Sequence, residues 1–229
     1  MTARRDLSDF EFRLLPTADI TAGDYAVVCE LFRASYRQAD LAYIEKSLSR
    51  LGYLAIAYHD GRPAGFALGE TRVMDLPRLP RQVVSLAGIC CVGLEFRRRG
   101  LFGALEGRVL SAAPVPRAER QLSCGRMAHP ASFKVMGRSP SVVPRWGMRP
   151  TRWQKEVGTA IAEAYGVHGF DPETFVCIGS GTPIGYPIID IEAEAWEWEL
   201  FKPVNRDRGD SLLSISWGAN PPPGWDAVD

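Results

Sequence analysis

The fold depends on the stretch Val92-Gly93-Leu94-Glu95-Phe96-Arg97-Arg98-Arg99-Gly100-Leu101-Phe102-Gly103, a basic, glycine-containing turn between two apolar segments. Before the turn, residues 83–92 are almost all apolar or small, which is typical of a strand buried on both faces. After it, Leu101, Leu105 and Val109 recur every four residues and predict a helix over 101–111 with one apolar face. The stretch therefore predicts a strand, a turn and a helix in direct succession.

This turn has the composition of an anion-binding site. The first N–H groups of a helix have no partner within the helix, and the helix dipole adds a positive potential there. Gly100 lets the main chain approach a phosphate closely because it carries no Cβ. The guanidinium groups of Arg97, Arg98 and Arg99 suit pyrophosphate oxygens. A solvated basic turn is the alternative, so the inference depends on the order of strand, glycine and helix more than on the arginines.

Hydrophobic periodicity and turn signals predict the other elements. Before the central strand, we expect a strand, two helices capped at Thr21 and Asp40, and a hairpin around Asp60-Gly61, with arms at 53–58 and 63–73. Two prolines in Asp75–Arg81 predict a loop. After the turn, we expect strands over 121–124, 174–178 and 211–217 and helices over 130–137 and 154–165. Residues 191–201 fit helix or strand, and the proline-rich tail 221–224 is expected to be extended or disordered.

Composition limits the class of protein. Of the 229 residues, 27 are basic and 27 acidic, so no overall charge favours nucleic acid or a membrane surface. The five cysteines have no zinc-ligand spacing and are expected to be reduced thiols. The first ten residues lack the apolar core of a secretory signal, and no apolar run is long enough to span a bilayer. We therefore expect a cytoplasmic protein that needs no metal.

Around the turn the sequence resembles the GNAT superfamily of acetyl-CoA-dependent N-acyltransferases. Its signature is a strand ending in Val, then x-Pro-Glu-aromatic-Arg-x-x-Gly-x-Gly/Ala, then a helix. Leu94 stands where Pro is common, and Phe102 replaces the last small residue. The RRRGLF form looks like the branch that contains the aminoglycoside-modifying "enhanced intracellular survival" proteins. The order of elements before the turn also matches the family.

The resemblance implies an α/β (α+β) fold in which a mixed, largely antiparallel central sheet is flanked by helices. Residues 1–138 would form the acyl-CoA-binding core. Residues 139–229, for which we find no resemblance, would complete the sheet and hold the acceptor site. The implied activity is transfer of an acetyl or longer acyl group from CoA to a small-molecule or peptide amine, and a homodimer stays open.

The resemblance also assigns the cofactor-binding residues. Main-chain groups of Cys90, Cys91 and Val92 would pair with the pantetheine arm. The N–H groups of Arg98–Gly103, Leu101 and Phe102 included, would hold the pyrophosphate with help from Arg97. Ser132 is a further candidate for contact with the cofactor or the leaving thiolate.

Acyl transfer needs an oxyanion donor, a base for the amine proton and an acid for the thiolate. The family commonly uses a tyrosine after the fifth strand as the acid, but residues 125–133 contain none. Glu70 and His129 are therefore the catalytic candidates, against the alternatives of an exposed strand carboxylate and a structural loop histidine. Tyr165 and Tyr186 could supply the missing hydroxyl. A covalent acyl group on Cys91 is the less favoured alternative to an inert thiol.

If residues 191–201 formed a strand, Glu192, Glu194, Trp196 and Trp198 would share one face, which suits a cationic amine. The alternative is an amphipathic element whose tryptophans pack inward. Two other functions stay open: a GNAT-like module that binds CoA or another ligand without catalysis, and a GNAT-derived enzyme that modifies a nucleic-acid base. The charge balance argues against the latter.

Overall fold

The structure is a computed structural model that describes residues 7–116, 118–167, 169–218 and 220–227. The chain forms two compact units. The first unit comprises Met1–Thr71 and Ala87–Pro114, and the second comprises Arg72–Leu86 and Val115–Asp229. Strands β4 (Arg62–Leu76) and β5 (Leu79–Val92) contribute residues to both units.

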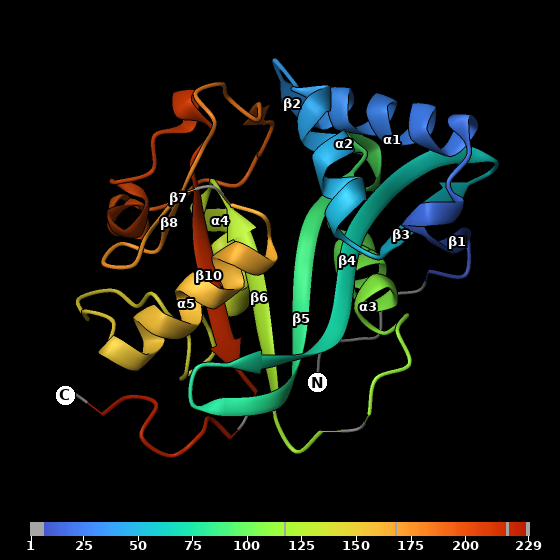
Figure 1. Ribbon diagram of the computed structural model, residues 1–229. Helices are drawn as coiled ribbons and strands as arrows, with labels where there is room; N and C mark the ends of the chain where they lie inside the picture. Colours follow the sequence, from blue (N-terminus) through green and yellow to red (C-terminus); the bar gives the residue numbers. More distant parts are fainter. Residues whose placement is uncertain (1–6, 117, 168, 219, 228–229) are drawn as a thin grey trace. The chain divides into compact units, whose positions relative to one another are not determined.

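Figure 1 labels α-helices and strands. Each helix or strand other than β4 and β5 falls into one unit or the other. The first unit contains β1 (Phe10–Pro16), η1 (Thr17–Asp19), α1 (Ala22–Ser35), β2 (Tyr36–Arg37), α2 (Leu41–Arg50), β3 (Tyr53–His59), η2 (Leu94–Phe96) and α3 (Leu101–Leu110). The second unit contains β6 (Gln121–Met127), α4 (Pro130–Met136), α5 (Arg152–Ala164), β7 (Gly169–Asp171), β8 (Val176–Ile178), β9 (Tyr186–Pro187), η3 (Ala195–Phe201), η4 (Arg206–Arg208) and β10 (Ser211–Trp217).

In the first unit the sheet has the strand order β1-β3-β4-β5. Strands β1 and β3 are antiparallel, with Phe10 opposite His59 and Pro16 opposite Tyr53. The predicted hairpin joins β3 to β4, and its central residues Asp60 and Gly61 have φ values of 49° and 73°. Aspartate and glycine tolerate this left-handed region better than most residues, which explains why the turn forms at this dipeptide.

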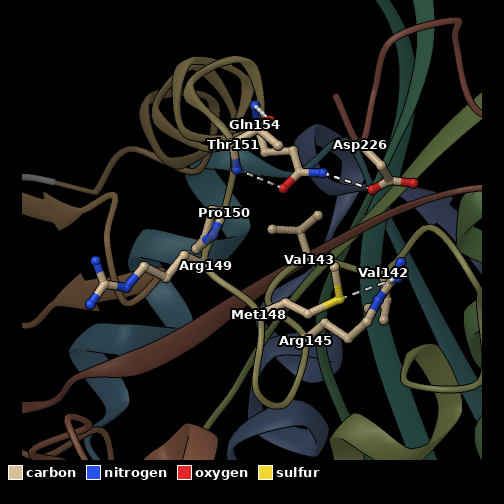
Figure 2. A pocket seen from close by; sticks show the side chains of 9 residues that line it. All are labelled: Val142, Val143, Arg145, Met148, Arg149, Pro150, Thr151, Gln154 and Asp226. Carbon is tan, nitrogen blue, oxygen red and sulfur yellow. Dashed lines mark hydrogen bonds between the residues drawn. The ribbon is translucent and has the colours of Figure 1, made fainter. Parts of the chain in front are cut away.

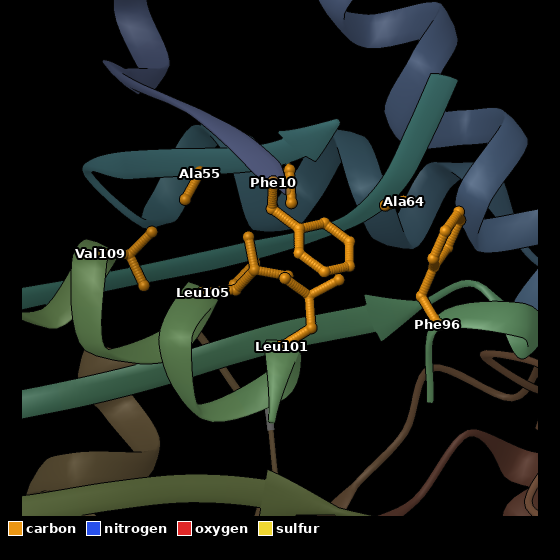
Figure 3. Close-up of a cluster of buried hydrophobic side chains, with 9 residues drawn as sticks. Phe10, Ala55, Ala64, Phe96, Leu101, Leu105 and Val109 are labelled. Carbon is orange, nitrogen blue, oxygen red and sulfur yellow. The ribbon is translucent and has the colours of Figure 1, made fainter. Parts of the chain in front are cut away.

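The helices of the first unit begin where the sequence predicts. Thr21 and Asp24 form a reciprocal capping box at the start of α1, and the Asp40 carboxylate accepts from Ala42 N at the start of α2 (3.0 Å). Helix α3 packs its apolar stripe against Ala55 and Ala57 of β3, together with Phe10 and Phe96 (Figure 3). Residues of β3 that point to the opposite face are buried as well, so both faces of the sheet are covered here.

In the second unit the sheet order is β4-β5-β6-β10-β8-β7. Strand β10 pairs antiparallel with β6, from Leu212 opposite Met127 to Trp217 opposite Leu122, and antiparallel with β8 on its other edge. Strands β7 and β8 are also antiparallel. The expected fold class, a mixed and largely antiparallel sheet flanked by helices, is therefore confirmed.

The loop predicted over Asp75–Arg81 is wrong. Strand β4 continues to Leu76 and β5 begins at Leu79, so only Pro77 and Arg78 form the turn. The Asp75 carboxylate accepts from Arg81 N (2.8 Å), and the indole of Trp153 donates to the carbonyl of Pro77 (2.8 Å). These bonds from side chains stabilise the hairpin, and sequence periodicity does not reveal them.

Two strand boundaries also differ from expectation. Strand β6 extends three residues beyond the predicted end, to Met127, because its residues from Leu122 to Met127 are paired with β10. The strand predicted over 174–178 begins only at Val176, and the short strand β7 precedes it. Pairing partners far away in the sequence set these boundaries, and local propensity does not.

The C-terminal tail is ordered, contrary to expectation. Residues 223–226 form a turn in which Trp225 is 1% exposed. Its ring packs edge-on against Trp153 (5.5 Å) and Trp217 (5.8 Å), and its indole donates to the carbonyl of Ser141 (3.3 Å). Burial of one large aromatic side chain thus overrides the extended tendency of three prolines.

Asp210 holds the loop between η4 and β10. Its side chain has no exposed surface and accepts four hydrogen bonds, two from the Arg208 guanidinium (2.9 and 2.6 Å) and one each from the N–H groups of Gly179 (2.8 Å) and Asn205 (3.1 Å). Burial by itself would raise the pKa of Asp210, but these bonds outweigh it and hold the pKa below the ordinary value of 3.8.

We expect Asp210→Asn to lower the free energy of unfolding of the second unit by about 2–3 kcal/mol at pH 7, because an amide nitrogen cannot accept these bonds. A depressed folded-state pKa stabilises the fold above the unfolded pKa, and this contribution is lost as the pH falls through the folded value. The difference between wild type and variant should therefore shrink below about pH 4. Urea titrations between pH 3 and 7 measure the free energy of unfolding of both proteins. A difference between them that stays constant over this pH range would contradict this account.

Candidate functional site

The basic turn ends at an uncapped helix. Gly100 is the N-cap of α3 with φ 91° and ψ 3°, and no side chain among the described residues caps this helix. Gly93 N donates to the carbonyl of Ala64 (2.8 Å), which ties the start of the turn to β4. The backbone of Arg98 is also left-handed, with φ 64°. The first N–H groups of α3 thus follow a sharp, unusual turn that only a glycine at position 100 adopts without strain.

The outer side of α3 is open at two glycines. A Cβ added at Gly103 or Gly107 would meet no atom within 4 Å. Phe102 is 39% exposed beside them, whereas Leu101 and Leu105 point into the core of the first unit, as Figure 3 shows. The N-terminus of α3 is therefore accessible to a ligand of substantial size.

The arginines of the turn have partners within the protein. Arg97 Nε donates to the carbonyl of Val92 (3.3 Å), where β5 ends. The Arg99 guanidinium forms an ion pair with Asp9 and lies 4.7 Å from the centre of the Phe10 ring. Two of the three guanidinium groups that the sequence assigns to a pyrophosphate therefore also help to fold the turn.

The thiols at the end of β5 are not activated. Cys91 is 2% exposed, and burial raises its pKa to about 12, although Ser35 and Arg97 act in the opposite direction. Burial, with a smaller contribution from Glu106, also raises the pKa of Cys90. A nucleophilic cysteine reacts as its thiolate, so both side chains favour an inert role over the acyl-cysteine alternative.

Glu70 lies in the first unit, on β4. It follows Ala64, the partner of Gly93, by six residues, which is about 20 Å along a strand. Its side chain lies against Gly52, because a Cβ added there would be 3.6 Å from Glu70 Cγ. Glu70 therefore lies far from the end of β5. It can accept a proton directly only from an amine bound away from Cys91, towards the middle of the sheet.

His129 lies in the second unit and caps α4. Its Nδ1 accepts from Ala131 N (3.1 Å), which places the ring proton of the neutral form on Nε2. Burial lowers the pKa of His129, and the nearby positive charges of Arg206 and Lys134 lower it further. The histidine is thus a neutral N-cap whose Nε2–H can donate. Ser132 is exposed on the same helix.

Glu106 is an acidic side chain that the sequence did not identify as a candidate. Glu106 lies on α3, four residues after Phe102, and burial raises its pKa to about 7. Its charge also affects Cys90, so the two residues are neighbours in the first unit. A carboxyl group with this pKa exchanges protons near neutral pH, as catalysis requires. Its position directly after Leu105 of the apolar stripe is the only signal in the sequence.

The strand alternative for residues 191–201 is wrong, and with it the shared face of two glutamates and two tryptophans. Residues 195–201 form the 3₁₀ helix η3, because Glu194 and Glu197 make a reciprocal capping box at its start. Glu197 is also paired with Lys134 (3.0 Å). Trp198 packs edge-on against His129 (4.9 Å), whereas Trp196 is 57% exposed and packs on Trp146 (5.0 Å).

The two candidate tyrosines differ in environment. Tyr165 is 7% exposed and donates to the carbonyl of Cys124 (3.0 Å), so its hydroxyl is engaged in the core of the second unit. Tyr186 donates to the Asp207 carboxylate, and this hydrogen bond raises its pKa. A raised pKa makes a hydroxyl a weaker proton donor.

A cavity of about 50 Å³ lies in the second unit, beside the ordered C-terminal tail (Figure 2). Gln154 and Asp226, joined by a hydrogen bond of 3.0 Å, line it together with Val143 and Met148. The residues that line it include none of the predicted site residues.

Within the described part of the chain, no His, Cys, Asp and Glu side chains group as metal ligands would. None of the described helices combines the length and apolar character that crossing a membrane requires.

No protein-family model matches the chain, and no curated protein matches it. Solved structures similar to it include many GNAT-family acetyltransferases. An aminoglycoside acetyltransferase from an uncultured soil metagenomic sample is 14% identical, with a TM-score of 0.31, over 43% of this chain and 65% of that protein. A GNAT family N-acetyltransferase from Escherichia coli, solved with CoA, is 16% identical (TM-score 0.40) over 56% of this chain and 68% of its own.

The ribosomal-protein-S18-alanine N-acetyltransferase of Escherichia coli is 9% identical, with a TM-score of 0.43, over 92% of this chain and 99% of that protein. This chain thus spans slightly less than two thirds of the metagenomic enzyme. All three TM-scores are below 0.5. The similar structures nevertheless include members of the GNAT superfamily, which the turn sequence also resembles.

Proposed function

We propose that the protein is an acyl-CoA-dependent N-acyltransferase, with acetyl-CoA as the favoured donor. The main supporting observation is the uncapped N-terminus of α3 behind left-handed Gly100, open to solvent at Gly103. N–H groups of this kind, next to guanidinium groups, favour a pyrophosphate. The five cysteines include no disulfide in the described structure, which suits a protein of the reducing cytoplasm.

In this proposal the N–H groups of Arg98–Gly103 hold the pyrophosphate, and the main chain of Cys90–Val92 holds the pantetheine arm. The acceptor amine attacks the thioester carbonyl, the C–S bond breaks, and CoA leaves as a thiol once its sulfur gains a proton. A main-chain N–H near Cys91 would donate to the oxyanion. Glu106 is proposed for the amine proton, and Glu70, which lies further along the sheet, would take it only through ordered water. His129 Nε2–H is proposed for the thiolate, with Ser132 as a further contact.

We propose that the acceptor is a small-molecule or peptide amine bound by residues 139–229. Trp196 supports this, because an indole that is 57% exposed is accessible to a cationic ligand. Trp146, which packs on it, has a buried indole nitrogen with no hydrogen-bond partner among the described residues. A ligand oxygen or a water molecule would satisfy that donor.

We expect Trp196→Ala to raise KM for an amine acceptor about 5- to 10-fold with little change in kcat, since a cation–π contact contributes about 1 kcal/mol. Trp196→Phe, which keeps an aromatic face, should lose less. Steady-state kinetics at saturating acetyl-CoA measure both. Equal KM values for the alanine variant and wild type would place the acceptor elsewhere.

Calorimetry with acetyl-CoA and longer acyl-CoAs tests donor binding, and thiol release with a panel of amines tests transfer. We expect a dissociation constant in the micromolar range, which corresponds to a binding free energy of about −7 to −8 kcal/mol. Absence of binding by every acyl-CoA would overturn the proposal. Binding without thiol release for any amine would favour the non-catalytic module, and salt-dependent binding of DNA or tRNA would favour a base-modifying enzyme.

A further inference from the structure

Arg99 is linked to the start of β1 by charge and by stacking. Its guanidinium forms an ion pair with Asp9 Oδ2, and the same oxygen lies 3.2 Å from His59 Nε2. The guanidinium also lies 4.7 Å from the centre of the Phe10 ring. The Arg99 side chain is 38% exposed and that of Asp9 42%. One carboxylate therefore connects the turn to β1 and to the end of β3.

Three rings hold the other end of the same turn. Phe96, the last residue of η2, is 4% exposed and packs edge-on against Phe10 at 5.7 Å. The His59 ring lies 5.2 Å from Phe10 and 5.3 Å from Phe96. The segment from Phe96 to Arg99 is thus fixed at both ends, while the left-handed residues Arg98 and Gly100 give it its sharp path.

We propose that Arg99 is a positioning residue. Its guanidinium, held by Asp9, fixes the N–H groups of Arg98–Gly103 for a pyrophosphate and does not itself bind the pyrophosphate. The inference rests on the proposed function, because it assigns roles within the same site. It differs from the sequence prediction that the guanidinium groups of Arg97, Arg98 and Arg99 all suit pyrophosphate oxygens.

Asp9 brings a negative charge to the proposed pyrophosphate site. The hydrogen bond from Arg99 lowers the pKa of Asp9, so the carboxylate is ionised at neutral pH. A carboxylate beside an anion site repels the anion, and removing it should strengthen CoA binding unless it orders the site. If Asp9 orders the site, its replacement should weaken CoA binding. If Asp9 only repels the anion, the same replacement should strengthen CoA binding.

Calorimetry with acetyl-CoA on Asp9→Asn, with Glu95→Gln as the matched control, distinguishes these roles. Glu95 lies in η2, is paired with Arg62 at 3.6 Å, and is 61% exposed. We expect Asp9→Asn to weaken binding about 3- to 5-fold, as the loss of a partly exposed ion pair allows, and Glu95→Gln to leave it equal or tighter. Equal or tighter binding by Asp9→Asn would overturn the proposal.

A double variant adds a second test. If Arg99 acts only through the ion pair, Asp9→Asn combined with Arg99→Gln should bind no more weakly than Arg99→Gln alone. Additive losses would mean that the Arg99 guanidinium contacts the cofactor directly, which contradicts the proposal.

Hydrogen exchange on the ligand-free protein separates this inference from the proposed function. Asp9→Asn should speed exchange of amides 97–103 and leave α2 unchanged. If no acyl-CoA binds wild type, the proposed function fails, and exchange alone decides whether Arg99 orders the turn. Unchanged exchange at 97–103 would overturn the positioning role.

Discussion

Replacing Trp225 by alanine is expected to lower the free energy of unfolding of the second unit by about 3–5 kcal/mol, the usual cost of truncating a fully buried tryptophan. The side chain is 1% exposed between Trp153 and Trp217. Truncation leaves a cavity lined by both rings and leaves the carbonyl of Ser141 without its indole donor. All six tryptophans of the chain belong to the second unit, so urea unfolding followed by tryptophan fluorescence reports on that unit.

Trp196→Ala is the matched control, because it removes the same side chain from an exposed position. Its expected cost is below about 1 kcal/mol. Similar losses for the two variants would mean that the tail does not pack on the second unit as the structure shows. The contrast also checks that the kinetic effect expected of Trp196→Ala is not a consequence of unfolding.

The elements that the sequence predicted correctly are those with local causes. The caps at Thr21 and Asp40, the Asp60-Gly61 turn and the apolar stripe of α3 each depend on residues a few positions apart. These interactions form within one element or one turn, so their signals survive in the sequence. The path of the basic turn into α3 belongs to this group, because Gly100 directly precedes the stripe.

The errors arose where distant residues decide the structure. The β4–β5 turn is held by Trp153, 76 positions after Pro77. The ordered tail depends on where Trp225 finds Trp153 and Trp217. A proline-rich segment has the same composition whether or not a side chain elsewhere binds it, so local rules default to a loop.

For the candidate site, the sequence identified the turn but not the separate roles of its arginines. Three consecutive arginines look equivalent in a sequence, yet Arg97 bonds to the end of β5 and Arg99 to Asp9. Asp9 is 90 positions away, and no spacing rule connects it with Arg99. Glu106 was missed for a similar reason, because its raised pKa depends on burial and not on its sequence neighbours.

Gly103→Glu is expected to weaken acetyl-CoA binding at least about 100-fold, while Gly107→Glu changes it less than about 3-fold. Both positions are glycines in α3 with open space for a side chain, so each substitution should favour the helix by about 0.5–1 kcal/mol. Near the N-terminus a glutamate also interacts favourably with the helix dipole, so loss of the fold cannot explain weaker binding.

The difference between the two variants comes from where the new charge stands. At position 103 the carboxylate lies in the first turn of α3, among the N–H groups proposed to hold the pyrophosphate, and two unit charges about 4 Å apart near a protein surface repel by about 4 kcal/mol. At position 107 it stands one helical turn, about 6 Å, further along the axis. At a separation of about 10 Å, screening by salt reduces the repulsion to about 0.5 kcal/mol. Calorimetry gives both dissociation constants, and thermal unfolding confirms that both variants fold. Equal weakening by the two glutamates, or tight binding by Gly103→Glu, would show that the cofactor does not bind at this helix terminus.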